Sequence, residues 1–212
     1  MKTEASTILA SSFWFWDKPS WGWAEVWALL AIALVSVALS ALIRPPERFF
    51  SFALINGTDN RWSTSKASVA LWTFALIFAF LAILFHTRGD GLDNLKLSSQ
   101  YLALIGIPAG AAVGAKAITQ NKVDKGQLTK NKQASPPDAL EGTAQLFSDD
   151  SGNVDLLDAQ YFAFSLLLLA YFFAQFLSSE STRLPTLPHT LVGLSGVSAA
   201  SYIVKKGVKN TP

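Results

Sequence analysis

Long apolar stretches separated by polar segments dominate the hydropathy pattern of this chain. A membrane-spanning helix needs about 20 consecutive, mainly apolar residues, because the bilayer core holds no water that could satisfy the backbone. Five stretches fit this description, and they cover residues 23–43, 67–85, 101–118, 159–177 and 187–204. The third and fifth are rich in Gly, Ala and Ser and are therefore less apolar than the others. The pattern predicts an all-α integral membrane protein with five transmembrane helices.

Composition narrows the class further. Half of the 212 residues are hydrophobic and only 15% are charged, which is typical of a chain that crosses a bilayer several times. The net charge of +2 gives no reason to expect nucleic acid as a partner. The chain has no cysteine, which excludes disulfides and thiolate metal sites.

Residues 1–22 form an aromatic segment ahead of the first span. Trp14, Trp16, Trp21 and Trp23 are typical of side chains that lie at the level of the lipid headgroups. We therefore interpret this segment as an interfacial anchor. Recognition of a carbohydrate or a lipid by the aromatic cluster is the alternative.

The distribution of Lys and Arg predicts the orientation, because cytoplasmic loops carry an excess of these residues. With the N-terminus outside, twelve of the 17 Lys and Arg residues fall in the inner segments and five in the outer ones. We expect an N-out, C-in topology, with a short basic tail at 207–212. The polar stretch 120–146 is then a mobile cytoplasmic linker. As an alternative role, this linker could bind a soluble protein or anionic lipid through Lys122, Lys125, Lys130 and Lys132.

Two similar units follow the first span, at residues 55–119 and 147–206. Asp59 aligns with Ser151 at a shift of 92 residues, and Gly106 aligns with Gly193 at a shift of 87. Each unit has a polar turn, an aromatic-rich span, an outer loop and a small-residue span that ends near Lys. Since each unit returns the chain to the side where it began, the repeats are parallel and not inverted. Chance similarity between two membrane hairpins is the alternative explanation.

Catalytic chemistry has no support in the sequence. No span carries an acidic residue near its centre, where it would indicate a proton relay or ion-coupled transport. Nucleotide-binding, protease, hydrolase and kinase signatures are also missing from the sequence. We expect a protein that is not an enzyme and has no organic cofactor.

The segment 149–158 partly matches a calcium-binding loop. With Gly152 at the sharp turn, oxygen-bearing side chains fall at five ligand positions, which are Asp149, Ser151, Asn153, Asp155 and Asp158. The first ligand position would be Phe147, which cannot bind a cation. The alternative is that Asp155 caps the helix that follows, with Asp158 in its first turn, as Ser63 would do for the corresponding helix of the first unit.

Small residues in the third and fifth spans predict close helix packing. Gly106, Gly110 and Gly114 recur every fourth residue and therefore share one face of a helix. The fifth span continues the theme with Gly193, Gly196 and Ala200, and Pro108 permits a kink in the third span. Lys116 and Lys205 fall near the cytoplasmic ends of these two spans.

Three functions remain open. In the first, copies of the chain self-associate into a channel or pore lined by the small-residue helices, with Lys116 and Lys205 at the cytoplasmic mouth. In the second, the protein is a membrane anchor or scaffold that holds its cytoplasmic loops for a soluble partner, and in the third it is a solute facilitator. The segments "DNRWSTSK" and "LIGIPAGAAVGAK" are loosely similar to uncharacterised bacterial inner-membrane proteins, which implies a multi-pass protein of the cell membrane and assigns no activity.

The topology gives a first testable prediction. A reporter fused to the C-terminus should be cytoplasmic and one fused to the N-terminus should be external, because the basic residues favour that orientation. Reporter activity on both sides of the membrane checks this. Termini on the same side would indicate an even number of spans and would remove the parallel repeat.

Overall fold

The computed structural model describes residues 21–42, 54–57, 59–89, 97–127, 133, 137–148, 153–179 and 183–208. Six helices make up this part of the chain, and they are α2 (Trp21–Leu42), α4 (Thr64–Thr87), α5 (Ser99–Asp124), α6 (Ala139–Gln145), α7 (Leu156–Ser178) and α8 (His189–Gly207). Most of the predicted aromatic segment, with Trp14 and Trp16, lies outside the described residues, as does the tail beyond 208. Trp23 falls within α2 and is half exposed.

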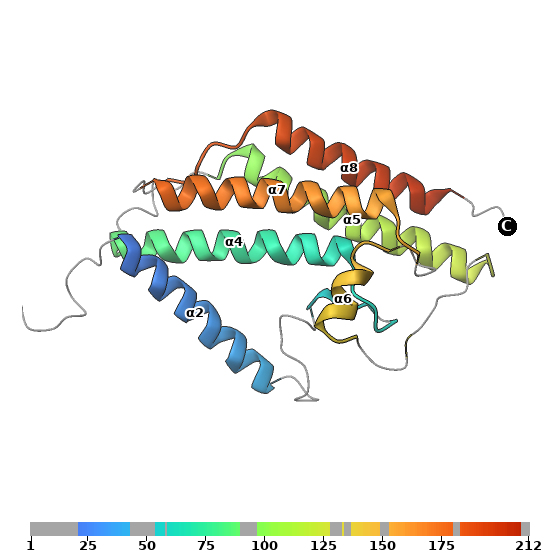
Figure 1. Ribbon diagram of the computed structural model, residues 1–212, viewed down its shortest axis with the longest axis horizontal. Coiled ribbons are helices and arrows are strands. Elements are labelled where there is room, and N and C mark those ends of the chain that lie inside the picture. The colour runs from blue at the N-terminus through green and yellow to red at the C-terminus, as the bar shows by residue number, and fades with distance from the viewer. Residues whose placement is uncertain are drawn as a thin grey trace, which may run out of the picture.

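The four helices α4, α5, α7 and α8 form the bundle, and α2 packs against α4 (Figure 1). Helices α4 and α7 start at the same end of the bundle, where α5 and α8 finish. Helix α5 contacts both α4 and α8, and α7 also contacts both of these helices. In Figure 1, α2 lies near the C-terminal end of α4 and then diverges from it.

Four of the helices are long and apolar enough to cross a membrane. They correspond to Gly22–Ser40, Thr64–Thr87, Ser99–Asp124 and Leu156–Ser178. The predicted fifth span forms a helix, α8. Because it is rich in Ser and Gly, α8 is less apolar than these four helices. Helix α5 continues to Asp124, beyond the predicted end at 118, and the left-handed backbone of Gly126 (φ 66°) follows its last turn.

Aromatic side chains fill the centre of the bundle. Trp72 of α4 and Tyr101 of α5 both pack edge-on against Phe172 of α7, with ring centroids 6.0 and 6.1 Å apart. Phe172 and Phe176 stack on each other, and all four side chains are at most 2% exposed. Lipid tails are as apolar as these side chains, so in a bilayer van der Waals packing holds the helices together rather than exclusion of water.

The residues that lead into α4 and α7 are paired in the same way. Asn56 pairs with Trp62 in an isolated antiparallel bridge, and Ser148 pairs with Val154 in another. The amide of Ser63 donates to the carbonyl of Ile55 at 2.9 Å, and Asp155 donates to Phe147 at the same distance. Every partner in the second loop lies 92 residues after its counterpart in the first. Asn60 adopts left-handed backbone (φ 59°), as a turn at this position requires.

Part of the linker, predicted to be mobile, is helical and docked. Asp138 caps α6 by accepting a hydrogen bond from the Glu141 amide at 2.8 Å. At the other end of α6, the side chain of Gln145 accepts a hydrogen bond from the Trp62 amide at 2.9 Å. A seven-residue helix is not stable alone, so its contacts with the loop before α4 stabilise it.

The docking of α6 depends on a close approach between Gly142 and the Trp62 indole. A Cβ atom at Gly142 would overlap the ring. We therefore expect Gly142→Ala to release α6 from the loop and to destabilise this end of the bundle by about 1–3 kcal/mol. Faster amide exchange in 139–146 and in 59–64 should report the release.

Gly110→Ala serves as the matched control. Gly110 is also helical, and a Cβ atom there meets nothing within 4 Å. Unchanged exchange around α6 in both variants would show that the Gly142–Trp62 contact does not hold the linker.

Candidate functional site

The first turn of α7 begins with a capping carboxylate. Asp155 has extended backbone, and its Oδ1 accepts hydrogen bonds from the amides of Leu157 at 2.9 Å and Asp158 at 3.1 Å. These bonds satisfy amides that have no partner within the helix, and the negative charge lies at the positive end of the helix dipole. The capping interpretation of Asp155 is therefore confirmed. Ser63 holds the equivalent position before α4, but its side chain makes no capping hydrogen bond.

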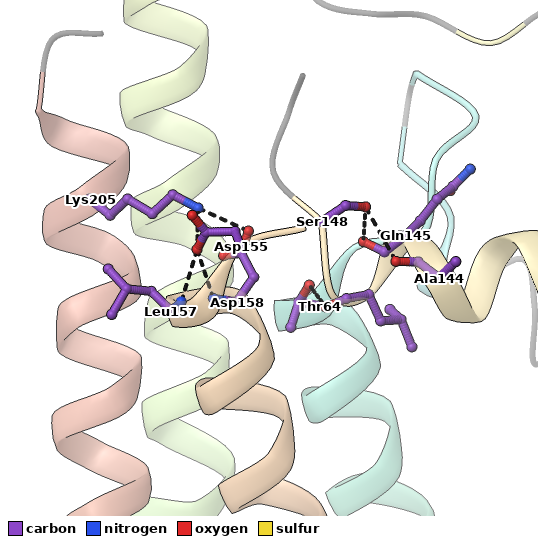
Figure 2. A network of polar contacts seen from close by, with 9 residues as sticks. Thr64, Ala144, Gln145, Ser148, Asp155, Leu157, Asp158 and Lys205 are labelled. Carbon is purple, nitrogen blue, oxygen red and sulfur yellow. Dashed lines mark hydrogen bonds and ion pairs between the residues drawn. The ribbon is translucent and has the colours of Figure 1, made fainter. Parts of the chain in front are cut away.

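Lys205 of α8 lies between two carboxylates of α7. Its Nζ is 2.7 Å from Oδ1 of Asp155 and 3.1 Å from Oδ2 of Asp158, as Figure 2 shows. Asp158 is only 1% exposed, and a buried carboxylate is costly unless a cation and hydrogen bonds compensate it. The ion pairs therefore fix the end of α8 against the start of α7.

The two contacts also change the acidity of the capping residue. Partial burial alone would raise the pKa of Asp155, but the hydrogen bond and charge of Lys205, together with the amides of Asp158 and Leu157, hold this pKa below its ordinary value. A lowered pKa means that the ionised form stabilises the folded state. This contribution is present above the ordinary pKa and is lost as the pH falls through the folded-state value.

The calcium-loop residues have other partners where the structure describes them. Asp155 and Asp158 both bind the Lys205 ammonium, which occupies the position between them that a cation would take. Asn153 is exposed, and Asp149 and Ser151 lie outside the described residues. Within the described ranges, no group of three or more His, Cys, Asp or Glu side chains could hold a metal ion. Calcium binding stays a prediction.

The small-residue positions divide into two sets. A Cβ atom at Gly114 would lie 3.7 Å from Ile203, and one at Gly196 would lie 3.4 Å from Ile107, so both glycines face the contact between α5 and α8. Cβ atoms at Gly106, Gly110 and Gly193 would meet nothing within 4 Å, and Ala200 is exposed. Pro108 is buried inside α5, which continues through it.

A pocket of about 190 Å³ opens at the end of the bundle where α4 and α7 begin, and we call it the end pocket. Its walls come from the loop before α4, the first turn of α4, the last turns of α5 and α8, and single residues of α6, its following loop and α7. The charged side chains that line it are Asp59, Arg61, Lys66, Lys116, Asp158 and Lys206. Hydroxyl and amide side chains complete the polar lining at Ser63, Thr64, Ser65, Thr119, Gln120, Gln145 and Ser148.

Sequence reasoning found only part of this site. It placed Lys116 and Lys205 at one end of the bundle and Asp155 and Asp158 in one loop, but it did not pair Lys205 with the aspartates. Arg61, Lys66 and Lys206 were interpreted only as orientation signals. Their shared position in segments predicted to be cytoplasmic was the available signal for a common pocket.

Comparison with protein-family models, with curated proteins and with solved structures gives no match for this chain. The assignment of a broad protein class therefore rests on the four apolar helices, which indicate a multi-pass membrane protein. Any more specific function has to be argued from the geometry of the site.

The ion-pair cluster predicts the effect of a single substitution. Lys205→Met keeps much of the aliphatic side chain but leaves Asp158 buried without its cation, so we expect a loss of about 2–4 kcal/mol at neutral pH. The deficit relative to the wild type should shrink as falling pH protonates the carboxylates of Asp158 and Asp155, because the lost cation then has less negative charge to compensate. Thermal unfolding of the purified protein across pH measures both effects, and Lys116→Met at an exposed position is the control.

A second measurement, on the wild type, distinguishes the ion pair from a calcium site. If Lys205 alone compensates the aspartates, millimolar calcium or a chelator should leave the melting temperature of the wild type unchanged. A melting temperature that falls on chelation would instead support the calcium loop.

Proposed function

We propose that this chain is a non-catalytic membrane scaffold. Its helix bundle holds polar segments, the linker and the loop before α4, in fixed positions at the cytoplasmic end. The observation that supports it most strongly is the docking of the linker on the loop before α4. Besides the Gln145–Trp62 bond, the Thr64 hydroxyl donates to the Leu146 carbonyl at 2.9 Å, and the Asn60 side chain donates to the Gln133 carbonyl at 3.0 Å. Polar segments tied together in this way form a fixed surface for a soluble partner.

The packing of the bundle supports a scaffold over a pore within one chain. Trp72, Phe172, Phe176 and Leu168 occupy the space between the helices and are at most 1% exposed. A pore or a solute path through a single chain would have to displace these side chains. Conduction would therefore require several copies.

We also infer that the two hairpin units arose by duplication and are parallel. Two loops with the same bridge and the same hydrogen bond, all displaced by 92 residues, support a common origin better than chance similarity does. The matching directions of α4 and α7, and of α5 and α8, fit parallel repeats (Figure 1).

The five-span, N-out arrangement is part of the same proposal. Helix α8 has 19 residues and would be about 28 Å long, close to the thickness of the hydrocarbon core. It packs along α5 and α7, and its end is held at the start of α7 by Lys205. The basic residues Arg61, Lys66, Lys116 and Lys206 gather at the end pocket, and by the positive-inside rule this supports a cytoplasmic position for this end.

A homo-oligomeric channel is the second candidate, and one observation favours it. Gly106 and Gly110 lie on an open face of α5, where Leu102 and Val113 are 58% and 70% exposed. Helices of two copies could approach closely along this face. The same face could equally contact lipid, so the observation supports the channel less than the docked linker supports the scaffold.

One experiment distinguishes the two candidates. Wild type, Gly110→Leu and the neighbouring control Ala109→Leu are reconstituted in liposomes, and ion and small-solute efflux is measured alongside particle size in mild detergent. For a scaffold we expect efflux at the level of empty liposomes in all three cases. Since a Cβ atom at Gly110 meets no described residue within 4 Å, Gly110→Leu should leave the melting temperature unchanged.

Efflux through the wild type that Gly110→Leu abolishes, together with a fall in particle size, would contradict the scaffold and establish the channel. Loss of size without any efflux would show self-association of a scaffold. Equal behaviour of the two leucine variants would mean that the open glycines contact only lipid.

A further inference from the structure

The end pocket has an excess of positive charge. Arg61, Lys66, Lys116 and Lys206 line it against Asp59 and Asp158. One oxygen of Asp158 is already bound to Lys205, which is not among the residues that line the pocket. Cationic side chains gathered around a polar hollow favour an anion as its occupant.

The first turn of α4 adds a second attraction for negative charge. Ser63 leaves the helix start without a side-chain cap, and its hydroxyl lies 3.2 Å from the hydroxyl of Ser65. Both serines line the pocket. Amides at a helix start and the positive end of the helix dipole bind phosphates and carboxylates in many proteins. In α7 the carboxylate of Asp155 fills this role, whereas in α4 no acidic residue does.

A buried carboxylate oxygen indicates which kind of anion fits. Asp158 is 1% exposed and lines the pocket, and its Oδ1 has no hydrogen-bond partner among the described residues. A buried acceptor without a donor is costly, so such an atom indicates a missing partner. An anion that only accepts hydrogen bonds would be repelled by this oxygen, whereas an anion that also donates one would satisfy it.

We propose that the end pocket binds a phosphate group that carries its own hydrogen-bond donor. The cationic side chains and the first turn of α4 hold the phosphate oxygens, and Asp158 Oδ1 accepts the donor. At neutral pH the donor is the P–OH of hydrogen phosphate or of the monoanion of a phosphomonoester, or a hydroxyl attached to a phosphodiester. Sulfate has the same shape but is fully ionised, so the site rejects it.

The position of the pocket allows two sources for this chemistry. It lies where α4 and α7 begin and where α5 and α8 end, which is the depth of lipid phosphates if these helices span the bilayer. A glycerol headgroup on a lipid phosphate and a soluble phosphate or phosphomonoester therefore offer the same groups.

The test uses the full chain in mild detergent, with sodium phosphate and sodium sulfate at equal ionic strength and neutral pH. Phosphate should raise the melting temperature at concentrations at least tenfold lower than sulfate, because sulfate lacks the donor. Asp158→Asn should remove this preference, since an amide donates to either anion. Lys116→Met, at an exposed position that should not impair folding, should weaken the phosphate response about tenfold.

Nanodiscs identify the source. Phosphatidylglycerol in a phosphatidylcholine bilayer should raise the melting temperature if the lipid is the occupant, and added phosphate should then have no further effect. A response to phosphate without a response to phosphatidylglycerol would assign a soluble occupant.

Equal responses to phosphate and sulfate in the wild type would overturn the proposal, because a general salt effect would explain them. No response to phosphate in detergent and none to phosphatidylglycerol in nanodiscs would overturn it as well. If Asp158→Asn fails to fold, Lys116→Met provides the test of the site. An undiminished phosphate response in this variant would exclude the end pocket as the phosphate-binding site.

Discussion

The pairing of one ammonium group with two carboxylates organises the polar end of this protein. Asp158 is buried at the start of α7, and its charge is tolerable there because Lys205 arrives from the end of α8. Asp155 joins the same cluster while it caps α7. The register of α8 against α7 follows from this cluster, since a shift of one residue would move Lys205 away from both acids.

The rest of the bundle relies on shape complementarity. Helices α4, α5 and α7 meet through aromatic rings, whereas α5 and α8 meet through small residues, as at Gly114 with Ile203 and Gly196 with Ile107. Both contacts suit a lipid environment, where close packing contributes more than exclusion of water. The aromatic contacts come mainly from α4 and α7, and the small-residue contact comes from α5 and α8.

The sequence was sufficient for features that depend on local pattern. The long apolar stretches located α2, α4, α5 and α7, and the Asp155 cap followed from residue type. Features that depend on distant partners were not predictable in this way. Helix α6 depends on contacts with the loop before α4, and Trp62 of that loop lies about 80 residues earlier in the chain. The ion pairs of Lys205 join α7 and α8, which no sequence periodicity relates. The end pocket combines seven segments of the chain, so the clustering of its charged side chains became visible only in three dimensions.

The bond between the Thr64 hydroxyl and the Leu146 carbonyl spans 82 residues of chain, and it closes a loop around the whole first hairpin. During synthesis, α4 and α5 are complete before the ribosome reaches Leu146. The start of α4 must therefore wait for its partner, and the segment that supplies this partner leads directly into α7. Assembly of the polar end is thus completed only after the segment before α7 has been synthesised, and a chain truncated after α5 would lack the Leu146 carbonyl that accepts this hydrogen bond.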